Sequence, residues 1–136
     1  MYIMFDMKRD ESREALTLQN SDALMIRVLK VVFAVLLLWM IWVVVETSLR
    51  SSLIEEWDTL AAIPWMTATL KDFYTNVFVI FLWVCWKEPG VFRKLLWLIL
   101  LVGLGSIATT FYVLLQLFRL RPGEGIRELI VRRNGA

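Results

Sequence analysis

Residues 64–88 form an apolar stretch of membrane-spanning length whose first half carries several polar side chains. Asp72 and Asn76 lie in that half, whereas residues 77–86 are almost purely apolar and aromatic. A carboxylate or a carboxamide in a lipid-embedded helix is costly unless it faces protein or water. Neighbouring segments must therefore be arranged to receive these groups, and this requirement constrains the fold more than any other feature of the chain.

The composition is typical of an integral membrane protein. Hydrophobic residues make up 59% of the chain and charged residues 21%, and most charges lie outside three long apolar runs. A run of about 20 apolar residues can cross a hydrocarbon core of about 30 Å. The sequence predicts an all-α membrane protein with a charged N-terminal tail (1–23), a membrane domain of three transmembrane helices (24–120, with helices near 24–46, 65–87 and 91–120) and a basic C-terminal tail (121–136).

The segments between and around these helices give weaker signals. Leu49, Leu53, Trp57 and Leu60 recur at helical spacing, which predicts a short amphipathic surface helix within 46–63; an exposed loop is the alternative. Residues 8–19 fit either a surface helix or a solvated tail, and residues 126–131 fit one more short surface helix. Pro64 is expected to begin the second membrane helix.

The connection at Pro89 and Gly90 is short, so the second and third membrane helices are predicted to form an antiparallel hairpin. Gly103 and Gly105 predict a close approach of helices inside the third. Orientation is less determined. Basic residues before the first helix and in the second connection favour a cytoplasmic N-terminus, whereas the Arg-rich C-terminus, which three spans would place on the opposite side, argues the other way.

Polar residues of the second and third helices are predicted to share one seam. Counted outward from the turn, Asp72 comes level with Ser106, and the Tyr112 hydroxyl could reach the same layer. We expect Asp72 to bond with a hydroxyl of Ser106, Thr109 or Tyr112, or with a basic neighbour such as Arg50. The seam residues are Thr69, Asp72, Asn76, Ser106, Thr109, Tyr112 and Gln116. They either lock the hairpin, bind a proton, cation or polar ligand, or contact a partner subunit.

The residue inventory argues against several classes of function. The chain has no histidine and a single cysteine, Cys85, so we expect no His-ligated haem, no metal site and no enzyme activity. Nucleic-acid binding is not expected, because the aromatic residues lie mostly inside apolar runs. The one cofactor alternative is a lipid or pigment in an aromatic groove formed by Trp83, Trp86, Phe92 and Trp97.

A set of short motifs carries a resemblance to a known family. They are Pro64-Trp65, Ala68-Thr69-Leu70, Asp72-Phe73-Tyr74, Asn76-Val77, Trp83-Val84, Lys87-Glu88, Gly105-Ser106-Ile107, Thr109, Tyr112-Val113 and Gln116-Leu117. Over roughly residues 25 to 120 the chain resembles the membrane family catalogued as domain of unknown function 1475. The resemblance implies a multi-span membrane protein and supplies no activity, so no functional residue is carried over.

These observations favour a small non-enzymatic membrane protein, most simply an accessory or structural subunit that packs against a larger membrane complex. Its expected partners are membrane lipids and other membrane subunits. The alternative is an oligomeric protein that binds or conducts a proton, a cation or a small polar ligand through Asp72, Asn76, Ser106 and Thr109.

Overall fold

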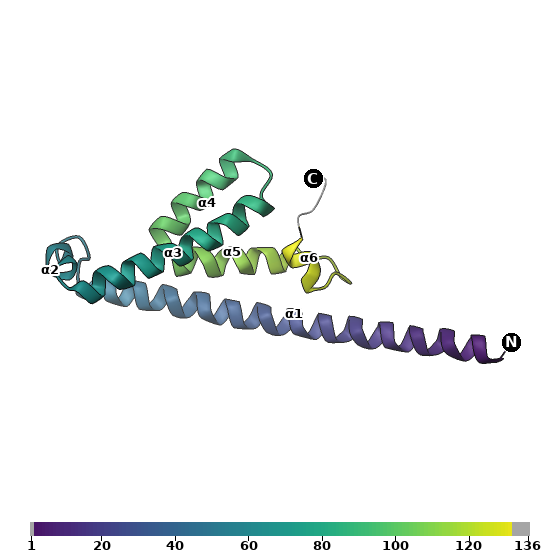
Figure 1. Cartoon of the computed structure of the whole chain (residues 1–136). Helices are drawn as coiled ribbons and strands as arrows, with labels where there is room; N and C mark the ends of the chain where they lie inside the picture. Colours follow the sequence, from purple (N-terminus) through teal and green to yellow (C-terminus); the bar gives the residue numbers. More distant parts are fainter. Residues whose placement is uncertain (1, 132–136) are drawn as a thin grey trace.

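The structure is a computed structural model of the 136-residue chain, and it describes residues 2–131. Within that range every regular element is a helix, and Figure 1 shows their arrangement. In chain order they are α1 (Tyr2–Arg50), α2 (Trp57–Ala61), α3 (Pro64–Lys87), α4 (Val91–Leu104), α5 (Ser106–Phe118) and α6 (Ile126–Ile130). Part of the predicted C-terminal tail, residues 132–136, lies outside the described residues.

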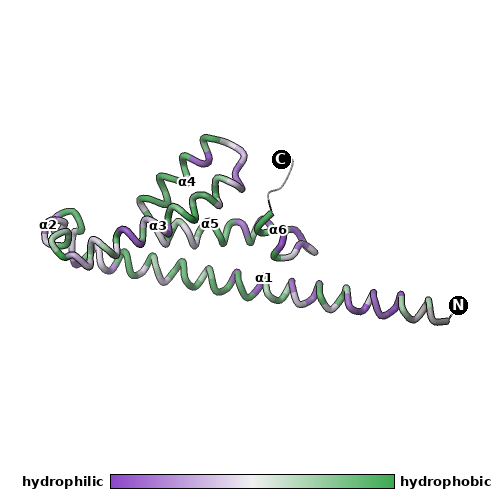
Figure 2. Tube along the Cα trace, viewed as in Figure 1, coloured by the Kyte–Doolittle hydropathy of each residue, from purple (hydrophilic) through white to green (hydrophobic). Residues whose placement is uncertain are grey.

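Helix α1 is continuous over 49 residues, so the predicted boundary near residue 23 is not a break in the backbone. The segment contains neither Gly nor Pro, and at 1.5 Å per residue it is about 70 Å long, more than twice a hydrocarbon core. Figure 2 shows its hydrophobic residues concentrated toward the C-terminal half. Its charged N-terminal half extends past the rest of the molecule (Figure 1).

A stripe of less exposed residues on α1 faces the remainder of the chain. The members recur every three or four positions, the spacing of one helical face, and they are Ile26, Leu29, Phe33, Leu37 and Met40. Among the described elements, α1 makes its most extensive contacts with α5. Apolar residues on the other faces, among them Val31, Val35 and Leu38, remain exposed.

Helix α3 begins and ends as the sequence predicts. Pro64 occupies the first turn, where its missing N–H is not needed, and Pro89 follows the last turn. A short helix is present within 46–63, as α2 (Trp57–Ala61), and of the four apolar residues expected on it α2 contains Trp57 and Leu60, whereas Leu49 belongs to α1. The short helix predicted at 126–131 is present as α6.

The predicted continuous third membrane helix is not formed, because residue 105 divides it. Helices α4 and α5 have 14 and 13 residues, about 20 Å each, which is shorter than the hydrocarbon core. Gly105 adopts φ +50°, and a Cβ atom there would overlap the Phe73 ring of α3. Only glycine fits both the backbone conformation and the contact.

The break changes the predicted hairpin. Helices α3 and α4 are in contact across the connection of residues 88–90, but α5 reverses direction at Gly105, packs along α1 (Figure 1) and brings its last turns back to the end of α3. The close approach predicted from small residues is present at Gly105, whereas a Cβ atom added at Gly103 would have no neighbour within 4 Å. Gly105 therefore serves mainly to form the turn between α4 and α5, and Gly103 does not mark a close helix contact.

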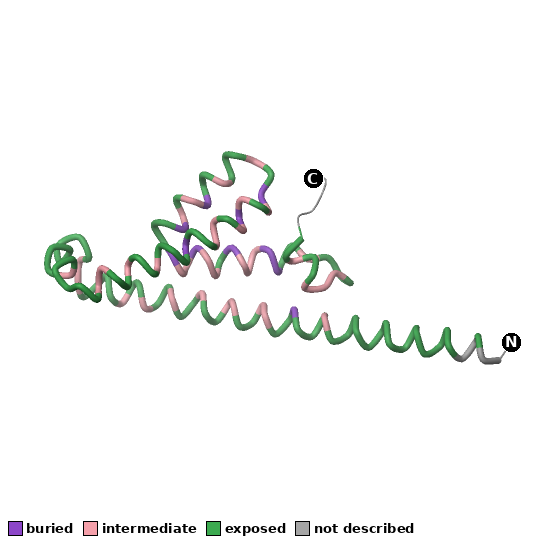
Figure 3. Tube along the Cα trace, in the orientation of Figure 1, coloured by how far each residue is buried: buried purple, intermediate pink, exposed green. Residues whose placement is uncertain are grey.

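A small core lies where α3, α4 and α5 meet, and Figure 3 shows how few other segments are buried. Its buried members, two from each helix, are Val77, Val84, Trp97, Leu101, Ala108 and Tyr112. Two of the described helices, α1 and α3, are long and apolar enough to cross a membrane. Both present large apolar side chains on their outer surfaces.

Candidate functional site at a buried glutamate

Glu88 is a carboxylate that the fold buries, with only 3% of its surface exposed. It caps the C-terminus of α3, where its backbone N–H donates to the Val84 carbonyl at 2.8 Å. The residue then leaves helical geometry with ψ 124°, and Pro89 prevents the helix from continuing. Because α3 ends here, the carboxylate lies within hydrogen-bond distance of side chains from α4 and from the end of α5. If α3 continued past residue 88, these side chains would be separated from the carboxylate.

Four side-chain donors converge on this carboxylate. The Tyr112 hydroxyl, the Gln116 Nε2 and the Arg119 Nη1 donate to Oε1 at 3.5, 3.3 and 3.3 Å, and the Arg93 Nη1 donates to Oε2 at 3.4 Å. Burial of an isolated carboxylate is strongly unfavourable, whereas paired and hydrogen-bonded carboxylates are tolerated. Two cations and two neutral donors therefore compensate the buried charge of Glu88.

The spacing of the donors explains why they meet. Tyr112, Gln116 and Arg119 follow one another at intervals of four and three residues, so they share one face of α5. Arg93 lies in the first turn of α4. The site therefore joins the end of α3, the start of α4 and the last turns of α5, which places these three chain positions at the same end of the molecule.

Aromatic contacts hold the Tyr112 ring in place. The ring centroid lies 5.3 Å from that of Trp83 in α3 and 4.6 Å from that of Trp97 in α4, with interplanar angles of 87° and 75°. Edge-to-face pairs of this kind contribute about 0.5–1.5 kcal/mol each. The four residues of the predicted aromatic groove therefore lie in two environments. Trp83 and Trp97 pack on Tyr112, whereas Trp86 and Phe92 are exposed.

Lys87, the neighbour of Glu88, connects this region to α6. Its ammonium group donates to the backbone carbonyls of Leu129 and Glu128 and lies 5.8 Å from the centroid of the Trp83 ring. Carbonyls in the last turn of a helix attract cations because they lack helical partners. The contact fixes α6 beside the end of α3.

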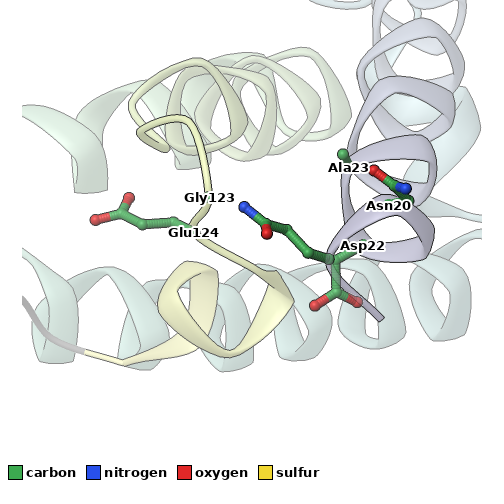
Figure 4. Close-up of a pocket in the computed structure, with 6 residues that line it drawn as sticks. Asn20, Asp22, Ala23, Gly123 and Glu124 are labelled. Atoms are coloured by element: carbon green, nitrogen blue, oxygen red, sulfur yellow. The ribbon is translucent and has the colours of Figure 1, made fainter. Parts of the chain in front are cut away.

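Helix α1 reaches the same end of the molecule through two contacts. The Lys30 ammonium lies 5.0 Å from the centroid of the Phe118 ring at the end of α5. Two to three turns before Lys30, α1 and the α5–α6 loop line a polar pocket, and Figure 4 shows the two segments facing each other. The lining residues are Gln19, Asn20, Asp22 and Ala23 of α1 and Gly123 and Glu124 of the loop. This part of α1 therefore lies level with the C-terminal segment.

The predicted polar seam is not assembled. Thr69, Asp72 and Asn76 are all exposed, and within residues 2–131 the Asp72 carboxylate has no hydrogen-bond or ion-pair partner. Thr69 donates to the Trp65 carbonyl at 2.8 Å, and Asn76 donates to the Asp72 carbonyl at 3.0 Å. The prediction that Asp72 points into the hairpin is wrong, because the chain reverses at Gly105 and α5 then brings Tyr112 level with Trp83 and Glu88 rather than with Asp72.

The α5 members of the seam have other roles. The Thr109 hydroxyl donates to the Gly105 carbonyl at 3.1 Å, in addition to the bond that this carbonyl accepts from the Thr109 backbone N–H. Ser106 is partly exposed, and its carbonyl accepts the Thr110 hydroxyl at 2.7 Å. Tyr112 and Gln116 are buried as polar-seam residues should be, but their partner is Glu88 rather than Asp72.

Glu88 was missed because it lies in a turn that the sequence places outside the membrane helices. The signal that points to it is the polar face of Tyr112, Gln116 and Arg119, which ends in a cation and therefore suits a carboxylate. A Gly-rich interruption halfway along an apolar run of excess length is the second signal. Together they indicate that the chain reverses and returns to the turn.

Comparison with known proteins adds one finding. A family model described as "Protein of unknown function (DUF1475)" matches residues 12–134, which includes most of both charged tails. Neither the curated proteins nor the solved structures contain a match.

Proposed function

The chain belongs to the DUF1475 family of proteins of unknown function, and we propose from its geometry that it is a small non-enzymatic integral membrane protein, an accessory or structural subunit that packs against a larger membrane protein complex. Support for the membrane location comes from α1 and α3, the two helices long and apolar enough to cross. Support for the subunit role comes from exposed polar side chains of α3, Asp72 and Asn76, and from the exposed apolar residues around them.

The proposed placement has α1 and α3 crossing the bilayer and the α4–α5 pair re-entering it. The Gly105 turn contacts Phe73, near the middle of α3, while Arg93 and Arg119, at the two far ends of the pair, both contact Glu88. Helix α4 thus enters beside the end of α3, and α5 returns to the same side. Non-helical backbone at membrane depth is tolerated where protein buries it, and Gly105 is buried.

This placement sets the proposed orientation. The side that carries both chain termini then holds most of the basic residues that flank the apolar helices. They are Arg27, Lys30, Lys87, Arg93, Lys94, Arg119 and Arg121. The half of the molecule on the opposite side has two basic residues, Arg50 and Lys71, together with the acidic residues Glu46, Glu55, Glu56 and Asp58. Basic residues mark the cytoplasmic side of a membrane protein, so we propose that both the N-terminal and the C-terminal segment are cytoplasmic.

The observation that carries the subunit proposal is the exposed carboxylate of Asp72. It lies in the third turn of α3 beside the exposed carboxamide of Asn76, and no side chain of residues 2–131 pairs with it. A carboxylate at that depth is strongly unfavourable against lipid. A polar group supplied by another membrane subunit would satisfy it, and the apolar surface around it would pack in the same interface.

The alternative function, binding or conduction of a proton, cation or polar ligand, receives less support. It requires Asp72 and Asn76 to face Ser106 and Thr109, but the first pair is exposed on α3 and the Thr109 hydroxyl is used at the Gly105 break. The non-enzymatic part of the proposal rests on the absence of histidine and the single cysteine.

The proposal is tested by extraction in native lipid, followed by size analysis and mass spectrometry of the co-purifying proteins. We expect a reproducible complex for the wild type, near-complete loss of the partner for Asp72→Leu, and partial retention for Asp72→Asn, which keeps hydrogen-bonding capacity. Thermal stability of the isolated chain should stay unchanged in both variants, because Asp72 has no partner within the described chain.

The matched control is Asp58→Leu, which removes an exposed carboxylate of the short helix α2. It should leave the complex intact. A wild-type protein that extracts as a monomer, or a complex equally stable in Asp72→Leu, would refute the subunit role.

A further inference from the structure

The cations around Glu88 exceed what the buried carboxylate needs. Four of them lie at one level of the molecule: Arg93 and Lys94 in the first turn of α4, Arg119 at the end of α5, and Lys30 of α1 over the Phe118 ring. We call these four residues the basic belt. One carboxylate, Glu88, lies among them, so the belt carries a net positive charge.

The two arginines of the belt have donors to spare. Each uses a single Nη1 group on Glu88, and 61% of the Arg93 side chain and 49% of the Arg119 side chain remain exposed. A guanidinium group has five N–H donors. Because Glu88 fixes both groups from the inside, their remaining donors are held in place for an anion that approaches from outside.

Acidic residues of the neighbouring elements are engaged elsewhere. Glu124 Oε2 accepts the Arg121 backbone N–H at 2.8 Å, and Glu128 Oε2 accepts the Gly125 backbone N–H at 2.8 Å. Asp22 lies beside the α5–α6 loop, where a Cβ atom added at Gly125 would come within 2.8 Å of its carboxylate oxygen. Glu88 is thus the acidic group that contacts Arg93 and Arg119 among the described residues.

Large aromatic side chains flank the belt at the same level. Trp86, Phe92 and Phe118 have 64%, 78% and 65% of their surfaces exposed. Exposed aromatic rings beside cations are typical of the boundary between headgroups and acyl chains, where the ring is partly in hydrocarbon. A free anion in water would make no use of these rings, whereas a phospholipid would contact both the rings and the cations.

We propose that the basic belt binds the phosphate of an anionic phospholipid headgroup in the leaflet that faces both chain termini. The outward N–H donors of Arg93 and Arg119 hold the phosphate oxygens, Lys30 and Lys94 add charge, and the flanking aromatic residues contact the glycerol and upper acyl region. This inference rests on the proposed insertion of α1 and α3 in a membrane, but it is independent of any partner subunit.

The test uses the purified full-length chain reconstituted with an equimolar mixture of phosphatidylglycerol and phosphatidylcholine, and native mass spectrometry reads the ratio of the two bound lipids. The reference is Glu88→Gln, which removes the buried charge and keeps an acceptor for the buried donors. The test variant carries Glu88→Gln, Arg93→Gln and Arg119→Gln, so that no unpaired buried carboxylate remains to unfold it.

We expect the triple variant to lose about 30-fold of the preference for phosphatidylglycerol that the Glu88→Gln reference shows, because the two variants differ only in the two arginines. The control adds Arg13→Gln and Arg50→Gln to Glu88→Gln. It removes the same charge at exposed positions away from the belt, and it should match the reference.

Equal preference in the triple variant and the reference would overturn the proposal, as would an equal loss in the control. Displacement of phosphatidylglycerol by millimolar inorganic phosphate would identify a free-anion site instead of a lipid site. Failure of the chain to float with vesicles of this lipid mixture would refute the membrane insertion itself, which separates that failure from the failure of the lipid site.

Discussion

Single residues at the end of α3 hold three helices together. The Glu88 carboxylate accepts hydrogen bonds from α4 and α5, and the donors on Tyr112 and Gln116 are themselves buried. A buried donor left without an acceptor costs about 1–3 kcal/mol. Glu88 is therefore more important for the fold than its position in a short turn suggests.

We predict that Glu88→Ala destabilises the chain by at least about 2 kcal/mol, because it leaves the Tyr112 hydroxyl and the Gln116 amide unpaired. Glu88→Gln should cost less than half as much, because its amide oxygen still accepts from both groups. Unfolding in mild detergent, followed by the fluorescence of the tryptophans that pack on Tyr112, measures the difference. Glu56→Ala, at an exposed carboxylate, should have no effect, and a similar loss in all three variants would contradict the prediction.

At the scale of elements, the decisive feature is the division of residues 91–118 into α4 and α5. Length and hydropathy predict where apolar helices lie, which is why α3 begins at Pro64 and ends before Pro89 as expected. They do not distinguish a glycine that allows close helix packing from one that adopts positive φ. The difference depends on the contact of Gly105 with Phe73, which lies 32 positions earlier in the chain and leaves no local signal.

The same error explains the wrong seam. If residues 91–120 formed one straight helix, Asp72 would lie level with Ser106, and the predicted seam would follow. Because the chain reverses at Gly105, the polar face of α5 meets Glu88 instead. The helical face that joins Tyr112 to Gln116 was predictable, because it depends only on local periodicity. Its partner was not, because that depends on the direction of the chain after the break.

We predict opposite effects for two glycines of this segment. Gly105→Ala forces a Cβ atom against the Phe73 ring at φ +50°, and it should destabilise the fold by about 1–3 kcal/mol. Gly103→Ala adds a methyl group in open space inside α4 and should be neutral or stabilising by up to about 1 kcal/mol. Thermal unfolding of both variants gives the comparison. Equal stability of the two would show that Gly105 is an ordinary helical residue.

The basic residues that flank the apolar helices lie mostly at one end of the described molecule and the acidic residues of the α1–α2 connection at the other, and the reversal at Gly105 explains this distribution. With three complete spans, the basic residues Arg27 and Lys30 of α1 and those after α5 would lie on opposite sides, in conflict with each other. With a re-entrant pair, the contacts of Lys30 with Phe118 and of Arg119 with Glu88 bring both groups to one side. The charge pattern of the chain is then consistent with a single orientation.

Cysteine accessibility distinguishes these two topologies. In a Cys85→Ser background, single cysteines are placed at Ser12 in the N-terminal half of α1, at Glu55 between α1 and α2, and at Arg127 in α6, all three at exposed positions. A membrane-impermeant thiol reagent added to sealed vesicles should label positions 12 and 127 from the cytoplasmic side and position 55 from the other side. Three complete spans would instead place position 127 with position 55. Labelling of 12 and 127 from opposite sides would therefore refute the re-entrant pair, and the proposed lipid site at the shared basic end would have to be abandoned with it.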